Sequence, residues 1–366
     1  MNNLTGKGFF IWKLVNAENG DANVIASLAT QANLTHVLIK IADGITSSNI
    51  DSVTGADLIP PVAQALRSRQ IQVWGWHYVY GDDPLGEANK AIQRVQQLNL
   101  DGYVIDAEVE YKDPGKDSAA RTFMTQLRAS LPIFPVALSS YRFPSFHPQF
   151  PWAAFLEKCD YNMPQVYWLL NHNPGEQLIR SVREFQALVP FRPIIPVGAA
   201  FTQSNWSPTA SDETEFLQTA QNLNLTAVNF YEWANCRTRL PPEIWNTIAS
   251  YPWPSPLTQD IAQQYIALLN THDVNQVLNL YTFNAVHVNA ARTIQGLDAL
   301  RAWYNSFFNQ VLPNATFTLT SFSGEGSSRH LTWTATSGAR RVLNGNDTLG
   351  LLNGKIAYHY TFFNIS

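Results

Sequence analysis

Residues 101–108 read Asp-Gly-Tyr-Val-Ile-Asp-Ala-Glu, a short apolar run that ends in two carboxylates. Side chains alternate along a β-strand, so Asp106 and Glu108 share one face, whereas Tyr103 and Ile105 take the other. If Tyr103 and Ile105 pack under helices, both carboxylates point into the centre of the fold, about 6.6 Å apart along the strand. The stretch therefore predicts a buried strand with an acidic end.

Seven further apolar runs accompany this one, and helix-like amphipathic segments separate them. Apolar strands that alternate with helices are typical of a parallel sheet covered by helices. Eight alternations in about 250 residues predict an α/β fold, a closed (β/α)₈ or TIM barrel. The predicted strands are residues 8–12, 36–41, 71–79, 102–108, 134–140, 161–167, 193–199 and 227–233.

A proline-rich segment divides the chain. Residues 250–257 read Ser-Tyr-Pro-Trp-Pro-Ser-Pro-Leu. Three prolines in so short a segment exclude a helix or a central strand and predict a stiff linker. We therefore predict a barrel domain over residues 1–249, a linker over 250–257 and a smaller domain over 258–366.

The composition is unusually poor in charge. Charged residues make up 14% of the chain, against roughly 25% in a typical soluble domain, and eleven Trp and fourteen Tyr are present. Amides, hydroxyls and aromatic rings suit a neutral, hydroxyl-rich ligand such as a sugar, although a low charge need not have a functional meaning. The net charge of −4 without a basic stripe argues against a nucleic-acid partner.

Other classes of protein are disfavoured by simple patterns. No apolar stretch approaches 18 residues, so no membrane span or membrane partner is expected. Two cysteines cannot form a disulfide framework. The N-terminal residues carry no signal-peptide pattern, which leaves the native compartment open, secretion from a longer precursor included. No cofactor is predicted.

In (β/α)₈ barrels the chemistry lies at the carboxyl ends of the strands. Almost every predicted strand of this chain ends in polar or aromatic residues, and we expect them to converge on one opening. The candidate substrate-binding residues are Trp12, His77, Tyr78, Tyr141, Gln165, Tyr167, Trp168 and Trp233.

The two carboxylates are the candidate catalytic residues. Two acids in a partly apolar enclosure cannot both ionise freely, so one pKa should rise. Glu108, nearer the rim, is then the expected general acid, and the deeper Asp106 should stay anionic and stabilise a cationic intermediate, as glycosidic cleavage requires. A structural pair bonded to the backbone or to Lys40 is one alternative. A metal site is another, but no His or further Asp has the spacing to complete a shell, so no metal is predicted.

At these residues the chain resembles two families of glycoside hydrolases. Residues 37–44 (Val-Leu-Ile-Lys-Ile-Ala-Asp-Gly), 73–78 (Val-Trp-Gly-Trp-His-Tyr) and 104–108 are similar to the strands of glycoside hydrolase family 25, the muramidases. Residues 101–108 and 163–167 (Met-Pro-Gln-Val-Tyr) also resemble the family 18 chitinases. The resemblance implies cleavage assisted by the N-acetyl group of the substrate, with Glu108 as acid and Asp106 as stabiliser. It covers roughly residues 8–170, and the Asp that muramidases carry on strand one is absent from residues 9–12 (Phe-Phe-Ile-Trp).

The last 109 residues read as helices followed by antiparallel strands, an α+β pattern. Residues 270–274 (Asn-Thr-His-Asp-Val), 296–303 and 354–359 make this part similar to nuclear transport factor 2-like, or SnoaL-like, domains. The resemblance implies a cone-shaped fold, and His287, His330, Arg340 and His359 are candidate pocket residues. We expect a binding or assembly role for this domain, a homodimer included.

Two functions stay open from the sequence. The first is an enzyme that hydrolyses a β-linked, N-acetylated polysaccharide resembling peptidoglycan or chitin. The second is a non-catalytic glycan-binding or scaffold protein that keeps the barrel groove. Only the enzyme needs Glu108, whereas both need the aromatic residues at the strand ends.

Overall fold

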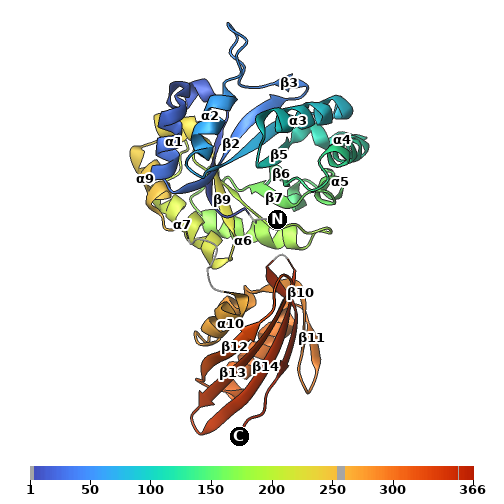
Figure 1. The fold of residues 1–366 in the computed structure, drawn as a ribbon, viewed down its shortest axis with the longest axis vertical. Coiled ribbons are helices and arrows are strands. Elements are labelled where there is room, and N and C mark those ends of the chain that lie inside the picture. The colour runs from blue at the N-terminus through green and yellow to red at the C-terminus, as the bar shows by residue number, and fades with distance from the viewer. Residues whose placement is uncertain (1–3, 254–259, 353) are drawn as a thin grey trace. The chain divides into compact units, whose positions relative to one another are not determined.

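The computed structural model describes residues 4–253, 260–352 and 354–366. The chain divides into two compact units, Met1–Pro256 and Leu257–Ser366 (Figure 1). The second half of the predicted linker, residues 254–257, lies outside the described residues. Ser250, at the start of that predicted linker, is the last residue of helix α9 (Pro242–Ser250).

Eight parallel strands form a closed barrel in the first unit (Figure 1). Each strand pairs with its neighbours in chain order, and β1 pairs with both β2 and β9, which closes the sheet on itself. A short strand, β3 (Thr46–Ser47), adds to β2 in the antiparallel direction. The predicted α/β barrel is confirmed. Its strands are β1 (Gly6–Ile11), β2 (Leu34–Asp43), β4 (Gln72–Val79), β5 (Gly102–Ala107), β6 (Val136–Tyr141), β7 (Tyr161–Gln165), β8 (Val197–Ala199) and β9 (Ala227–Tyr231).

Amphipathic helices surround the strands. In α3 the buried residues Ala88, Ala91, Val95 and Leu98 recur every three or four positions, which is the period of one helix face. Asp83 caps the first turn of α3 by accepting a hydrogen bond from the Gly86 N–H at 2.9 Å. Besides α9, the helices are α1 (Ala22–Gln31), α2 (Ile59–Arg67), α3 (Pro84–Leu98), α4 (Lys116–Ser130), α5 (Trp152–Leu156), α6 (Pro174–Gln186), α7 (Ala210–Asn222) and α8 (Trp233–Thr238).

Strand alternation separates two apolar layers in the barrel. Tyr103 and Ile105 of β5 pack in the layer between strands and helices. Val104 packs in the barrel interior with Trp74 and Trp76 of β4. Because large side chains fill the interior, the barrel is a packed core. It also holds one buried polar pair, His36 and Asn229, joined at 2.7 Å.

One buried carboxylate in the helical layer has a predictable effect on stability. Glu213 of α7 is fully buried, and neither of its carboxylate oxygens has a hydrogen-bond partner among the described residues. Burial, together with the charge of Asp212, raises the pKa of Glu213 well above its usual range. Since the folded protein then holds a proton that the unfolded chain releases, stability falls as the pH rises above the unfolded pKa.

We expect Glu213→Gln to remove this loss. The variant should be more stable than wild type at pH 8 by about 1.4 kcal/mol for each unit of the pKa shift, and the gain should shrink toward pH 5. Urea denaturation at both pH values measures it, with the exposed Glu243→Gln as control. Identical pH slopes for wild type and Glu213→Gln would contradict the expectation.

The second unit is an α+β domain. Its six-stranded sheet has the order β11-β10-β15-β14-β13-β12. Helix α10 packs against β12 and β13, and α12 packs against β10 and β11. The strands are β10 (Tyr281–Val288), β11 (Thr293–Gln295), β12 (Thr316–Ser323), β13 (Ser328–Ser337), β14 (Arg340–Leu352) and β15 (Lys355–Phe362), and the helices are α10 (Ile261–Leu269), α11 (Val274–Leu278), α12 (Leu297–Ser306) and one π-helical turn, Phe307–Val311.

Two of the four candidate pocket residues of this unit meet in its interior. His287 and His359 are buried, and their ring centroids are 4.6 Å apart. His330 and Arg340 lie instead on the surface. His330 is exposed because side chains alternate along β13 and the next residue, Leu331, takes the inward position. Arg340 is held by the carbonyl oxygens of Gln310 and Val311 at the surface.

None of the helices in the described part of the chain combines the length and the apolar character that a membrane crossing requires.

Candidate active site

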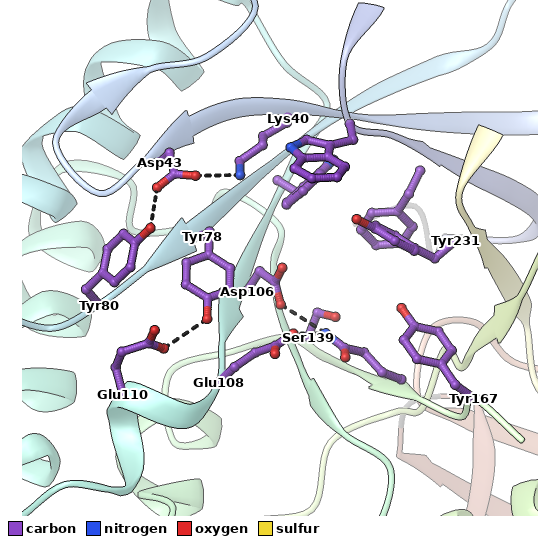
Figure 2. Close-up of a pocket in the computed structure, with 14 residues that line it drawn as sticks. Lys40, Asp43, Tyr78, Tyr80, Asp106, Glu108, Glu110, Ser139, Tyr167 and Tyr231 are labelled. Atoms are coloured by element: carbon purple, nitrogen blue, oxygen red, sulfur yellow. Dashed lines mark hydrogen bonds and ion pairs between the residues drawn. The ribbon is translucent and has the colours of Figure 1, made fainter. Parts of the chain in front are cut away.

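A pocket of about 370 Å³ opens where the barrel strands end (Figure 2). Such a volume lies within the range of small-molecule sites, which run from about 300 to 1,000 Å³. Side chains from seven of the eight strands, or from the residues that follow them, reach it. The lining residues are Phe10, Trp12, Lys40, Asp43, Trp76, Tyr78, Tyr80, Asp106, Glu108, Glu110, Ser139, Gln165, Tyr167 and Tyr231.

The predicted carboxylates lie together in this pocket. Strand β5 ends at Ala107, and Glu108 begins the turn that follows, yet both acids line the cavity. The amide of Gln165 bridges them, because its Nε2 donates to Asp106 Oδ1 at 3.0 Å and to Glu108 Oε1 at 2.9 Å. Asp106 is the deeper of the two, with 9% of its surface exposed, and Glu108 is more open.

Burial decides the protonation of this pair. It raises the pKa of Asp106 well above its usual range; repulsion from Glu108 adds to this, and Lys40 opposes it. Burial also raises the pKa of Glu108, against the hydrogen bond from Gln165. The sequence suggested that only Glu108 would be raised, with Asp106 anionic. Burial instead raises both pKa values, so the expectation of a single raised pKa is wrong, whereas the role of Asp106 as an anion during catalysis stays a prediction.

Lys40 does not pair with the two carboxylates directly. Its Nζ donates to Asp43 Oδ2 at 2.6 Å, and Tyr80 donates its hydroxyl to Asp43 Oδ1, also at 2.6 Å (Figure 2). The ammonium lies 4.9 Å from the centroid of the Trp76 ring. The alternative of a structural ion pair between Lys40 and the Asp106–Glu108 pair therefore has no contact to support it.

A third carboxylate, Glu110, stands beside the pair. Its Oε2 accepts a hydrogen bond from the Tyr78 hydroxyl at 2.9 Å (Figure 2). Burial, with the hydrogen bond to Glu110, raises the pKa of the Tyr78 phenol far above its usual range, so this hydroxyl stays protonated and fixed in direction. Carboxylates thus dominate the charge at the opening, with Lys40 as the cation among the lining residues.

Of the eight predicted substrate-binding residues, four line the pocket: Trp12, Tyr78, Gln165 and Tyr167. His77 does not. It is fully buried on the opposite side of β4 from Trp76 and Tyr78, where its Nε2–H donates to the Gly44 carbonyl at 2.7 Å and its Nδ1 accepts from Tyr103 at 2.9 Å. Burial lowers the pKa of His77 to about 4, so the ring is a neutral structural group.

Trp168 and Trp233 also lie outside the pocket. Each follows the last residue of its strand by two or three positions, and the chain there has turned toward the helical layer. Trp168 packs against Trp206 and Phe216. Trp233, the first residue of α8, packs between Phe9 and Trp245. Both indoles are core groups.

Tyr141, the last residue of β6, is the fourth residue that the pocket lining lacks. Its ring stacks on His147 at a centroid distance of 3.7 Å, and the Lys112 ammonium lies 4.1 Å from the ring centroid. The Tyr141 ring is therefore held by its contacts with His147 and Lys112. Ser139, two residues earlier on the same face of β6, lines the pocket.

Several lining residues were not among the sequence candidates. Tyr231 and Trp76 could have been found from alternation, because each lies on the inward face of its strand. Simple alternation does not place the other three: Asp43 ends β2 beyond a register shift between Lys40 and Ala42, Tyr80 follows β4, and Glu110 lies in the 3-10 turn after β5. No group of three or more His, Cys, Asp or Glu side chains in the described ranges is arranged to hold a metal ion.

Comparison with known proteins assigns a domain family to the second of the two units. The model of the SnoaL-like domain family matches residues 262–359. No curated protein matches the chain. Solved structures that are similar to part of it include a SnoaL-like family protein from Agrobacterium tumefaciens str. C58 (22% identity, 28% of this chain and 94% of that one, TM-score 0.25). A nuclear transport factor 2-like protein of unknown function from Cytophaga hutchinsonii ATCC 33406 is 14% identical over 30% of this chain and 94% of that one (TM-score 0.25).

An LEH-like epoxide hydrolase from M. tuberculosis is 15% identical over 28% of this chain and 77% of that one, with a TM-score of 0.24. These likenesses carry no argument about activity. The family match and the strand topology together give the architecture. In chain order, an eight-stranded parallel barrel is followed by a SnoaL-like, nuclear transport factor 2-like domain.

Proposed function

We propose that the barrel is a glycoside hydrolase that cleaves a β-linked, N-acetylated polysaccharide resembling chitin or peptidoglycan. The observation that carries the proposal is the pair Asp106 and Glu108, joined by one amide donor in an aromatic pocket at the strand ends. The resemblance of residues 101–108 to the catalytic strands of families 18 and 25 agrees with it.

The reaction needs one proton and one negative charge at the same bond. Because both pKa values are raised, the pair retains a proton to a higher pH than an isolated carboxyl would. Glu108 is the more open of the two, so it is the acid that a glycosidic oxygen can reach. When Glu108 gives up the proton, Asp106 acts as the anion that stabilises the developing positive charge, and Lys40 favours that ionised state.

The remaining lining residues suit a sugar. Tyr167 and Tyr231 place aromatic rings beside the carboxylates, with Phe10 and Trp76 beneath them. Aromatic faces pack against the C–H groups of a pyranose, while Ser139 and Gln165 offer polar contacts to its hydroxyls. Aromatic residues stand where muramidases carry the strand-one Asp, and the pocket contains two further carboxylates, Asp43 and Glu110.

A panel of polysaccharides with detection of new reducing ends tests the proposal. Chitin, peptidoglycan and their oligosaccharides should yield reducing ends, whereas cellulose and β-1,3-glucan should yield few, because substrate-assisted cleavage needs the 2-acetamido group. Retention of a glycan with no turnover of any would favour the non-catalytic glycan-binding alternative. Preference for a plain glucan would contradict the N-acetyl requirement alone.

Trp12 is expected to contribute directly to glycan binding. Its ring is 47% exposed at the pocket. Trp12→Ala should weaken binding of a confirmed glycan ligand by about 1–3 kcal/mol, the usual cost of losing an aromatic contact. Isothermal titration measures the change, with the exposed Phe146→Ala, outside the pocket, as control. Unchanged affinity would remove Trp12 from the binding site.

A further inference from the structure

Gln165 is the one hydrogen-bond donor that the described residues offer to the carboxylates of Asp106 and Glu108. A carboxamide carries two N–H groups, and each carboxylate takes one of them. The amide Nε2 lies 3.0 Å from Asp106 Oδ1 and 2.9 Å from Glu108 Oε1. Both donors are therefore used on the pair, and the amide keeps only its carbonyl oxygen for a ligand.

The backbone around Gln165 fixes this amide in place. Gln165 is the last residue of β7, in register with Tyr141 of β6 and Val197 of β8. Its main-chain carbonyl oxygen accepts a hydrogen bond from the Tyr167 N–H at 2.9 Å. Met163, two residues earlier, packs in the barrel interior, so alternation points the Gln165 side chain inward as well. The amide thus reaches the carboxylates from a strand that is paired on both sides.

The aromatic neighbours of the acid pair do not share this task. Tyr167 and Tyr231 line the same pocket, but within the described residues neither hydroxyl forms a hydrogen bond to the pair. Tyr78 donates its hydroxyl to Glu110 instead, at 2.9 Å. The direction of the two carboxyl groups therefore depends on Gln165.

The bridge also decides where a proton can sit. An oxygen that accepts an N–H uses a lone pair in that bond, so Asp106 Oδ1 and Glu108 Oε1 are held as acceptors. A proton on either acid then lies on the other oxygen, Oδ2 or Oε2. Because Glu108 is the more open acid, its Oε2 is the oxygen that a ligand in the pocket can reach.

We propose that Gln165 is the positioning residue of the acid pair: it holds one oxygen of each carboxyl and directs the proton that Glu108 transfers onto Oε2. The proposal rests on the proposed glycosidase function of the barrel, in which Glu108 is the acid. A neutral amide suits this role, because it supplies two donors and no charge. A cation in its place would favour ionisation of both carboxyls, and an apolar side chain would leave both without a donor.

Gln165→Met tests the role, because methionine is similar in length to glutamine and has no N–H. Without the two donors both carboxyls are harder to ionise, so the whole pH profile of turnover should move up by about one pH unit or more. The variant should also lose more stability than wild type between pH 5 and pH 8, because a folded-state pKa raised further above its unfolded value costs stability as the pH rises. Urea denaturation at both pH values measures this second effect without any substrate.

The matched control is Gln72→Met. Gln72 is also a strand glutamine of the barrel, the first residue of β4, but its side-chain oxygen accepts from the neutral indole N–H of Trp74 at 3.1 Å. Any loss of stability in this variant should be the same at pH 5 and pH 8, and its pH profile should coincide with that of wild type. A Gln165 that served packing alone would give this same pattern.

A second measurement reads the bridge with Gln165 unchanged, so the test does not depend on the folding of Gln165→Met. The two Nε2 protons of Gln165, followed by NMR in glutamine-labelled protein, should shift together as the pair loses its proton, because the acceptor oxygens become more negative. In the double variant Asp106→Asn/Glu108→Gln neither position ionises, and this shift should disappear.

Equal changes in stability at pH 5 and pH 8 for Gln165→Met would overturn the proposal, and so would Nε2 protons that do not respond to pH. Turnover by Gln165→Met with the pH profile of wild type would overturn it while leaving the glycosidase function intact. Failure of wild type to cleave any glycan would instead contradict the glycosidase function, whereas urea denaturation and NMR would still decide whether Gln165 places the proton.

Discussion

Glu108→Gln is expected to reduce turnover by at least about 10²–10⁴-fold on any glycan that the wild-type protein cleaves, the usual contribution of general acid–base catalysis. Glutamine keeps the shape of the side chain and can still accept the hydrogen bond from Gln165, but it has no proton to donate. Because the binding surface is unchanged, affinity for the substrate should stay within a few-fold of wild type.

Reducing-end release from an N-acetylated substrate measures the effect, and the exposed Glu243→Gln is the matched control. Circular dichroism checks that the fold is intact. Equal turnover by Glu108→Gln and wild type would rule out the glycosidase function. A parallel loss in Glu243→Gln would instead point to a contaminating or unrelated activity.

Asp106→Asn is expected to lower turnover by at least about 10²-fold while it makes the protein more stable. Turnover falls because the positive charge that develops on the sugar loses its anionic partner. Stability rises because burial raises the pKa of Asp106 in the folded state, so wild type loses stability as the pH climbs above the unfolded pKa. Asparagine does not ionise and can still accept from Gln165, so the variant escapes this loss.

The same substitution should shift the pH profile of any residual activity. In wild type burial raises the pKa of both carboxyls, and repulsion from Glu108 adds to the rise at Asp106. Without a charge at position 106, Glu108 loses its proton more readily, so the alkaline limb of the profile moves to lower pH. Activity against pH and urea denaturation at pH 8 measure the two effects. A less stable Asp106→Asn protein would mean that the carboxylate supports the fold and would weaken its catalytic assignment.

Short-range patterns in the chain predicted much of the site. The apolar runs located all eight barrel strands, because each strand is covered on both faces. Alternation along residues 102–108 correctly assigned Tyr103 and Ile105 to the helical layer and directed Asp106 into the barrel. The same rule, applied to β4, would have assigned His77 to the helical layer, since Trp76 and Tyr78 face inward.

The sequence by itself therefore determined the barrel, the α+β second domain and the position of the two carboxylates, since these depend on periodicities of two and of three to four residues that a chain carries locally. Tertiary structure alone decided which strand-end residues reach the pocket. Trp168 and Trp233 lie where the chain has already turned into the core after their strands. Asp43 ends β2 beyond a register shift, and Tyr80 and Glu110 lie after their strands. It also decided that burial raises the pKa of Asp106 as well as that of Glu108, because solvation is lost according to depth in the folded barrel, and depth is not a property of neighbours in sequence.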